Sequence, residues 1–401
     1  MTTTAEQRSQ RRKNPGLIED VLVGDRRTDP MKSLARACLM IGAFFMPMLS
    51  FRILGKTTAT TESGLTVSDL FFFFSLAALT FSRTRRKLPP TPAWYVGVAF
   101  VVVSGVFATF HAQASVQSIF ADARMLFVLL IWQWTIRHLI DDEGRIRKIM
   151  TSYIVGATTS AFAAILQLEG HLFVSIGTLI NGRASGLAKH PDDTGSLLAL
   201  GLAFSVGLAM HSKGRRRYAY IAMSVIIAMG LICTGSVSGM LTGAAGALIS
   251  MVLGGITPKQ IFVVAFIAVV AYVGALSIQG ANGTKSLNPI ARFERATGPE
   301  AGGSNSIGPR EGTWRGAWHG IVNSPFLGHG LDIYSGVTYT DPFNNTAEET
   351  HDIFLMGWYQ GGFFFLLGEL ICIAEGFRRT WIGGRVHPIR TTIFAGGVTV
   401  L

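Results

Sequence analysis

Ten apolar stretches, most of them near the length of a membrane-crossing helix, dominate this 401-residue chain. Hydrophobic residues make up 49% of the chain and charged residues only 15%, which is too apolar for an ordinary soluble enzyme. An α-helix needs about 20 apolar residues to cross a bilayer. The sequence therefore predicts an all-α, polytopic helical membrane protein with ten or more transmembrane helices. The predicted spans are 34–54, 67–82, 92–110, 119–138, 149–168, 194–210, 219–234, 237–255, 260–279 and 352–376.

Lysine and arginine predict the orientation of these spans, because cytoplasmic loops are enriched in both. With the N-terminus inside, 25 of the 35 cations fall on the cytoplasmic side. We then expect a basic cytoplasmic tail at 1–33, nine helices in 34–279, an extracytoplasmic catalytic loop at 280–350 and C-terminal helices in 351–401. The apolar stretch after Arg390 is too short to cross before Leu401, so we expect this last part to be truncated.

The cations on the outer side are candidates for a functional role, because lysine and arginine are otherwise enriched on the cytoplasmic side. They are Arg52, Lys56, Arg124, Arg183, Lys189, Lys285, Arg292, Arg295, Arg310 and Arg315. Most of them can simply face water. Guanidinium groups also bind diphosphates through paired hydrogen bonds and stabilise the charge of a leaving group. We therefore treat Arg183, Arg310, Arg292 and Arg295 as candidate diphosphate ligands.

His351 is the best candidate for a catalytic group, because it stands where the polar outer loop becomes an apolar helix. Thr350 is a plausible cap of that helix. The helix dipole disfavours a protonated imidazole at this end, and a neutral histidine can act as a general base. The alternative is an interfacial histidine that happens to begin a helix.

The outer loop also contains an amphipathic pattern from about 311 to 323, with Trp314, Ala317, Trp318, Ile321 and Val322 on one helical face. Pro325 ends the pattern. A helix of this kind lies on the membrane surface or covers a cavity.

Other patterns predict structure or exclude chemistry. Gly235, Gly239 and Gly243 recur at the four-residue spacing typical of close helix packing. Asp-Asp-Glu at 141–143 is interpreted as a solvated turn, and Asp192, Asp193 or Thr194 as a helix cap. The sequence has no phosphate-binding loop or metal-ligand motif, so we expect no cofactor and no metal. Its basic residues lie in short blocks between apolar runs, which indicates membrane topology and not nucleic acid.

Three pairs of motifs resemble the O-antigen ligase and O-antigen polymerase superfamily. They are Gly-Arg-Ala-Ser-Gly at 182–186 with His-Pro-Asp at 190–192, Pro-Arg-Glu-Gly-Thr-Trp at 309–314 with Pro-Phe-Leu-Gly-His-Gly at 325–330, and His-Asp-Ile-Phe-Leu at 351–355 with Gln-Gly-Gly at 360–362. The resemblance implies that Arg183 and Arg310 bind the diphosphate of an undecaprenyl-linked glycan and that His351 activates the acceptor hydroxyl. It also implies an outer loop with short helices over the site, and this loop offers Trp314, Arg315 and His329 for substrate binding.

Two departures from the family pattern stand out. Ser236-Val237 replaces a frequent Ser-Arg, and either Arg292 or Arg295 is a candidate for the missing cation. Asp192 and Asp352 stand where asparagine is common.

The resulting hypothesis is a metal-independent glycosyltransferase of the cytoplasmic (inner) membrane, with its site on the extracytoplasmic face. Its expected partners are an undecaprenyl-diphosphate-linked glycan, a glycan or lipid acceptor, and membrane lipids. Ligase and polymerase activities both fit the sequence. A transporter of small anions or lipid-linked sugars is the alternative from another class. Such proteins commonly show internal repeats and paired broken helices, and the sequence shows neither clearly.

Overall fold

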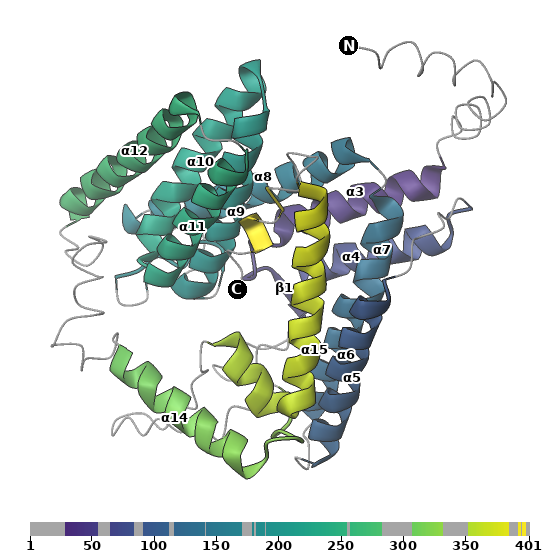
Figure 1. Cartoon of the computed structure of the whole chain (residues 1–401). Helices are drawn as coiled ribbons and strands as arrows, with labels where there is room; N and C mark the ends of the chain where they lie inside the picture. Colours follow the sequence, from purple (N-terminus) through teal and green to yellow (C-terminus); the bar gives the residue numbers. More distant parts are fainter. Residues whose placement is uncertain are drawn as a thin grey trace, which may run out of the picture.

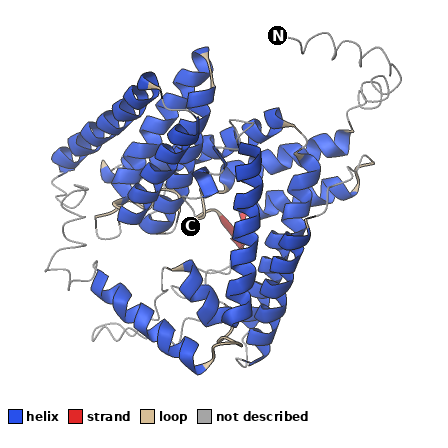
Figure 2. Cartoon of the chain, viewed as in Figure 1, coloured by secondary structure: helices blue, strands red, loops and turns tan. Residues whose placement is uncertain are grey.

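The computed structural model describes residues 29–54, 65–83, 91–111, 116–140, 142–170, 179, 182–188, 190–254, 257–282, 307–331, 352–384, 392–393 and 395–397 (Figures 1 and 2). His351, Arg292 and Arg295 lie outside the described residues. Arg310 is described in its backbone alone, within a helix.

The described part of the chain is built almost entirely of helices, and each predicted span overlaps a helix. These helices are α3 (Pro30–Phe45), α4 (Val67–Thr80), α5 (Pro92–His111), α6 (Val116–Leu126) continued by η1 (Phe127–Trp132) and α7 (Gln133–Leu139), α8 (Glu143–Leu168), α9 (Pro191–His211), α10 (Gly214–Thr234), α11 (Val237–Gly254), α12 (Pro258–Asn282) and α15 (Ile353–Gly384). The outer loop adds α14 (Ile307–Asn323). A small antiparallel pair, β1 (Arg52–Leu54) and β2 (Leu65–Thr66), was not predicted. The span 34–54 is corrected, because α3 ends at Phe45 and Arg52–Leu54 form a strand.

Six segments of the described chain are long and apolar enough to cross a membrane. They are Pro92–His111, Ser118–Leu139, Glu143–Leu168, Pro191–His211, Gly214–Thr234 and Ile353–Trp381. The apolar parts of α4, α11 and α12 are shorter. The structure thus confirms an all-α membrane protein, while the count of ten or more spans stays a prediction.

Polar side chains begin several of these helices. The Thr66 hydroxyl accepts from the Asp69 N–H while the Asp69 carboxylate accepts from the Thr66 N–H, a reciprocal cap at the start of α4. Asp142 caps α8, because its carboxylate accepts a hydrogen bond from the Arg145 N–H at 2.8 Å. Asp142 and Glu143 are exposed, in agreement with the predicted solvated turn, and the helix cap is an addition to it; Asp141 lies outside the described residues.

A glycine seam packs α11 closely against α9. A Cβ atom on Gly239 would lie 2.9 Å from the backbone of Gly195, and one on Gly243 would lie 3.3 Å from the Cα of Ala199. The prediction of close packing is confirmed for these two glycines. It is wrong for Gly235, which has φ +59° and ends α10 in the left-handed conformation that glycine adopts without strain.

Helix α15 is two arms joined at Gly362, where φ is +79° and ψ is −177°. A Cβ on Gly357 would contact the Glu369 carboxylate, although twelve residues of straight helix would separate the two by about 18 Å. The chain therefore folds back at Gly362, so that a short arm lies against a long one (Figure 1). The predicted span 352–376 is corrected accordingly, because the segment that continues along the bundle begins after Gly362.

The predicted orientation can be tested by cysteine labelling, because the native cysteines Cys38, Cys233 and Cys372 are buried. Asn323 at the end of α14 and Lys213 before α10 are both exposed. We expect Asn323→Cys to react with an impermeant maleimide on intact cells and Lys213→Cys to react only after permeabilisation. The reverse pattern would contradict both the topology and the outward location of the site.

Candidate functional site

A tight turn from Ser324 to Leu331 fits into the fold of α15. The N–H of His329 donates to the carbonyl oxygens of Tyr359 and Gln360 at 3.0 and 3.1 Å, and the N–H of Phe363 donates to the carbonyl of Pro325 at 2.9 Å. Gly362 lies so close to this turn that a Cβ there would overlap the backbone oxygen of Phe326. The glycine pair that ends in Gly362 therefore lets two segments of backbone meet.

His329 helps to hold this turn in place. Its Nε2 lies 2.9 Å from the Gly320 carbonyl on α14, and its ring stacks on Tyr359 with centroids 4.6 Å apart. These contacts connect α14, the turn and the short arm of α15. His329 is not among the side chains that line the groove described next, so its predicted contact with substrate stays a prediction.

An open groove of about 580 Å³ lies between α14 and the start of α15. Its lining residues are Trp314, Arg315, Trp318, His319, Val322, Asp352 and Leu355. Trp314 and Trp318 remain 39% and 53% exposed, so their indole rings are available to a ligand. The predicted substrate residues Trp314 and Arg315 therefore lie in the same groove.

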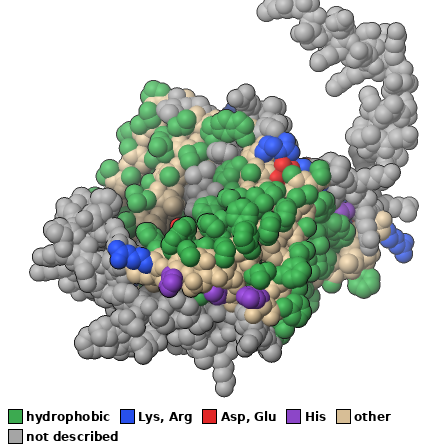
Figure 3. Space-filling model, turned by 60° about the horizontal axis from the view of Figure 1, so that its bottom comes forward, with side chains coloured by type: hydrophobic (Ala, Val, Ile, Leu, Met, Phe, Trp, Pro, Cys, Tyr) green, Lys and Arg blue, Asp and Glu red, His purple; other side chains and the backbone are tan. Residues whose placement is uncertain are grey.

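The apolar face of α14 differs from the predicted one. Ala317 and Ile321 are buried against Tyr359 of α15, while Trp314 and Trp318 face the groove. Figure 3 shows a large hydrophobic area on the described surface and, below it, a band that carries Lys or Arg and His side chains. The helix therefore both packs on α15 and presents aromatic side chains outward.

Asp352 begins the short arm of α15. Its Oδ1 accepts from the N–H groups of Phe354 at 3.0 Å and Leu355 at 2.9 Å, so Asp352 caps this helix. Thr350, the predicted cap, lies outside the described residues. Asp352 also lines the groove. His351 directly precedes it in the sequence.

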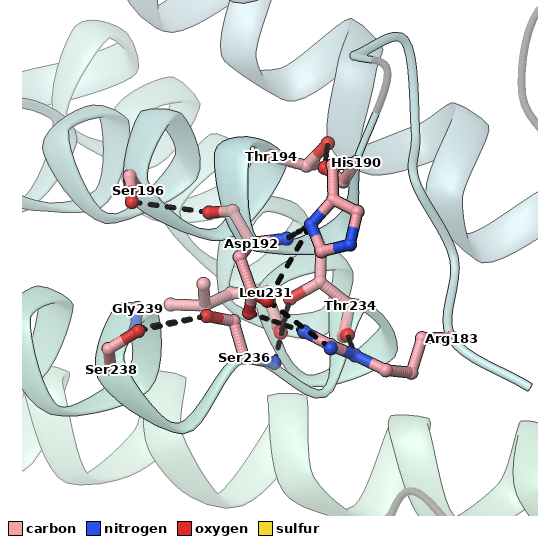
Figure 4. Close-up of polar contacts among 10 residues, drawn as sticks. All are labelled: Arg183, His190, Asp192, Thr194, Ser196, Leu231, Thr234, Ser236, Ser238 and Gly239. Atoms are coloured by element: carbon pink, nitrogen blue, oxygen red, sulfur yellow. Dashed lines mark hydrogen bonds and ion pairs between the residues drawn. The ribbon is translucent and has the colours of Figure 1, made fainter. Parts of the chain in front are cut away.

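A separate cluster of polar side chains surrounds Arg183 and connects the segment before α9 to the end of α10 (Figure 4). Its Nε donates to the Thr234 carbonyl at 2.9 Å, and its two terminal nitrogens pair with the two carboxylate oxygens of Asp192. The pairing is bidentate, the geometry in which arginine binds carboxylates and phosphates most strongly.

The guanidinium of Arg183 keeps binding capacity after these contacts. It carries five N–H donors, of which three are used by Asp192 and Thr234. The remaining donors can bind an anion. Only about 9% of the residue is exposed, so such an anion must approach from one side.

The backbone around Arg183 is held firmly. The Gly186 N–H and carbonyl both bond to the Gln167 amide, at 2.9 and 2.8 Å, and Ala184 donates to the Cys233 carbonyl at 3.2 Å. His190 caps α9, because its Nδ1 lies 3.3 Å from the Asp192 N–H. The predicted cap of α9 at Asp192, Asp193 or Thr194 is therefore wrong, because the cap is His190.

Exchange of Asp192 for asparagine tests how the pair acts. Asp192→Asn removes a negative charge beside Arg183 but keeps an oxygen acceptor, so a diphosphate would meet less repulsion. A relief of about 1 kcal/mol would lower the KM for the lipid-linked donor roughly five-fold. Arg183→Lys should raise the same KM, because lysine cannot form the fork. An equal rise in KM in both variants would mean that Asp192 only supports Arg183.

Sequence reasoning placed Trp318 on the same helical face as Trp314 but did not name it as a substrate residue, and it missed His319 in the groove and Asp192 as the partner of Arg183. The four-residue spacing of Arg315 with His319 places both on one helical face and could have indicated His319. No comparable spacing indicates Asp192, because a turn and the first residues of α9 separate it from Arg183.

Comparison with known protein families matches the O-antigen ligase family model to residues 222–368. This range contains most of α10, all of α11, α12 and α14, and α15 past its fold at Gly362. Residues 222–368 are therefore similar to an O-antigen ligase domain. The resemblance seen in the sequence is thereby confirmed. A search of the curated proteins finds no match to this chain.

The matched range contains the groove with all of its lining residues, and Arg183 precedes it. The family supports a membrane enzyme of the ligase or glycosyltransferase kind that handles lipid-linked glycans.

Proposed function

We propose that this chain is a metal-independent glycosyltransferase that moves a glycan from an undecaprenyl-diphosphate carrier to an acceptor hydroxyl on the extracytoplasmic face of the inner membrane. The observation that carries the proposal is the groove between α14 and α15. It combines two exposed indole rings, a cation and the capped helix start that follows His351, all within the range that matches the O-antigen ligase family model.

The chemistry requires a base and a stabilised leaving group. The acceptor oxygen forms a bond to the anomeric carbon, the bond from that carbon to the carrier diphosphate breaks, and the acceptor proton passes to His351. The diphosphate leaves with the electron pair of the broken bond. Arg310, Arg183 and the candidates Arg292 and Arg295 would stabilise this charge through charge-assisted hydrogen bonds.

The lining of the groove supports a glycan ligand. Trp314 and Trp318 present rings that are apolar in the body and polar at the N–H, and they can pack against the C–H face of a sugar. Arg315 and His319 add donors for hydroxyl groups. Whether the acceptor is a second lipid-linked glycan or another molecule decides between polymerase and ligase.

Arg310→Lys tests the role of the guanidinium fork. Lysine keeps the charge but loses bidentate binding, so we expect release of carrier diphosphate to fall about ten-fold or more while expression is unchanged. The matched control is Arg217→Lys at the opposite end of the bundle, where activity should stay at the wild-type level. Wild-type turnover by Arg310→Lys would show that the geometry of Arg310 is unimportant.

A further inference from the structure

A second groove, of about 690 Å³, opens at the other end of the helices, between α3, α8 and α10. Its lining residues are Met40, Phe44, Glu143, Gly144, Arg147, Lys148, Thr151, Ser152, Val155, Arg216 and Tyr220. None of them belongs to the candidate site for glycan transfer. The groove lies at the basic ends of the helices, which the cation distribution predicts to be cytoplasmic.

The groove changes from charged to apolar along its length. Glu143 and Val155 lie twelve residues apart on α8, which corresponds to about 18 Å. At the apolar end of the groove, the part of α8 that contains Val155 and Gly156 lies against Phe44 of α3. One helical turn closer to the charged end, the Ser152 hydroxyl donates a hydrogen bond to the Met40 carbonyl at 2.7 Å. A ligand of matching shape has a charged head and an apolar tail.

Three cations surround the charged end of the groove. In the described part of the chain, Arg147, Lys148 and Arg216 form no ion pair, and Lys148 and Arg216 are exposed. The only acidic side chain in the lining is Glu143, so the charged end is net positive. The first turns of α8 and α10 lie at the same end and favour an anion through the helix dipole.

The hydroxyl groups halfway along the groove are already satisfied by the protein. Thr151 donates to the Arg147 carbonyl at 2.7 Å and lies 2.7 Å from the Tyr220 hydroxyl. Binding at this level therefore depends on shape, while recognition of charge is left to the three cations.

We propose that this groove binds one anionic phospholipid of the membrane leaflet at the basic ends of the helices. The phosphate would lie between Arg147, Lys148 and Arg216, and an acyl chain would lie along Val155, Phe44 and Met40. Basic pockets between transmembrane helices recognise anionic headgroups in this way. We choose a lipid and not a free phosphate because the lining continues from the three cations to the apolar side chains of Val155, Phe44 and Met40, which a free phosphate would not contact.

The experiment uses the full chain in nanodiscs of equal parts phosphatidylglycerol and phosphatidylethanolamine. Native mass spectrometry counts the phosphatidylglycerol that remains bound after transfer to detergent. The groove variant combines Arg147→Gln, Lys148→Gln and Arg216→Gln. Each cation contributes about five-fold to the affinity for an anionic surface, so we expect the affinity of this variant to fall roughly 100-fold. The matched control combines Lys213→Gln, Arg215→Gln and Arg217→Gln, which removes equal charge outside the groove and should retain the lipid.

Two further arms identify the ligand. Val155→Trp fills the apolar end without a change of charge and should also release phosphatidylglycerol, whereas excess inorganic phosphate should leave it bound. Equal retention in the groove variant and the control would overturn the proposal, and so would displacement by inorganic phosphate. If the groove variant does not fold, normal lipid retention by Val155→Trp would have the same consequence.

Discussion

Replacement of His351 by alanine is expected to reduce turnover by roughly 10²–10⁴-fold while donor binding stays nearly intact, because general-base catalysis contributes about this much. The expectation depends on the sequence position of His351 directly before the cap of α15 and on its match to the family histidine. Single-turnover rates and donor affinity, measured separately, distinguish a base from a phosphate ligand.

A pH series sharpens the same experiment. A base acts when neutral, so wild-type turnover should rise as the pH increases from about 5.5 to 8.5 through the usual range of histidine. His351→Ala and His351→Gln should lose this dependence. The control is His319→Ala, which removes a histidine from the same groove and should keep the pH profile. Turnover by His351→Ala within about three-fold of wild type would rule out the assignment.

Gly362→Ala should destabilise the protein strongly, although it replaces only one hydrogen atom by a methyl group. Residue 362 has φ +79° and ψ −177°, a conformation that essentially only glycine adopts and that costs other residues about 1–3 kcal/mol. The added Cβ would also overlap the Phe326 carbonyl oxygen. Strain and overlap together should destabilise the protein by more than about 3 kcal/mol.

The matched control is Gly376→Ala in the long arm of the same helix. A Cβ there would meet nothing within 4 Å, and alanine favours a helix over glycine. Thermal unfolding followed by fluorescence-detected size-exclusion should show a large loss for Gly362→Ala and none for Gly376→Ala. Equal melting temperatures would mean that α15 does not fold back at Gly362 in the membrane.

The helices could be predicted from sequence because each apolar stretch must satisfy its own backbone hydrogen bonds in lipid. The fold of α15 could not. The mean hydropathy of a stretch of about twenty residues does not reveal a break at one glycine such as Gly362. The conformation of Gly362 also depends on a turn that lies more than thirty residues earlier, at Phe326 and Gly328. The glycine pair at 361–362 was noted as a motif, but only the structure gives its physical reason.

The candidate site shows the same division. Helical spacing predicted α14 and placed Trp314 and Trp318 on one face, yet it gave that face to Ala317 and Ile321 as well. Periodicity shows which residues share a face but not which neighbour each one meets. The pair between Arg183 and Asp192 likewise depends on a turn whose shape is set by Gln167 and the end of α10.

The central claim, transfer from a lipid diphosphate at the groove of α14 and α15, is tested most directly by reconstitution. The purified chain is placed in proteoliposomes with an undecaprenyl-diphosphate glycan labelled in both the carrier and the sugar, together with an acceptor. We expect free undecaprenyl diphosphate to appear in equal amount to the glycan transferred, and His351→Ala to abolish both. Folded wild-type protein that moves the intact donor across the bilayer without releasing carrier diphosphate would contradict the account and indicate a transporter.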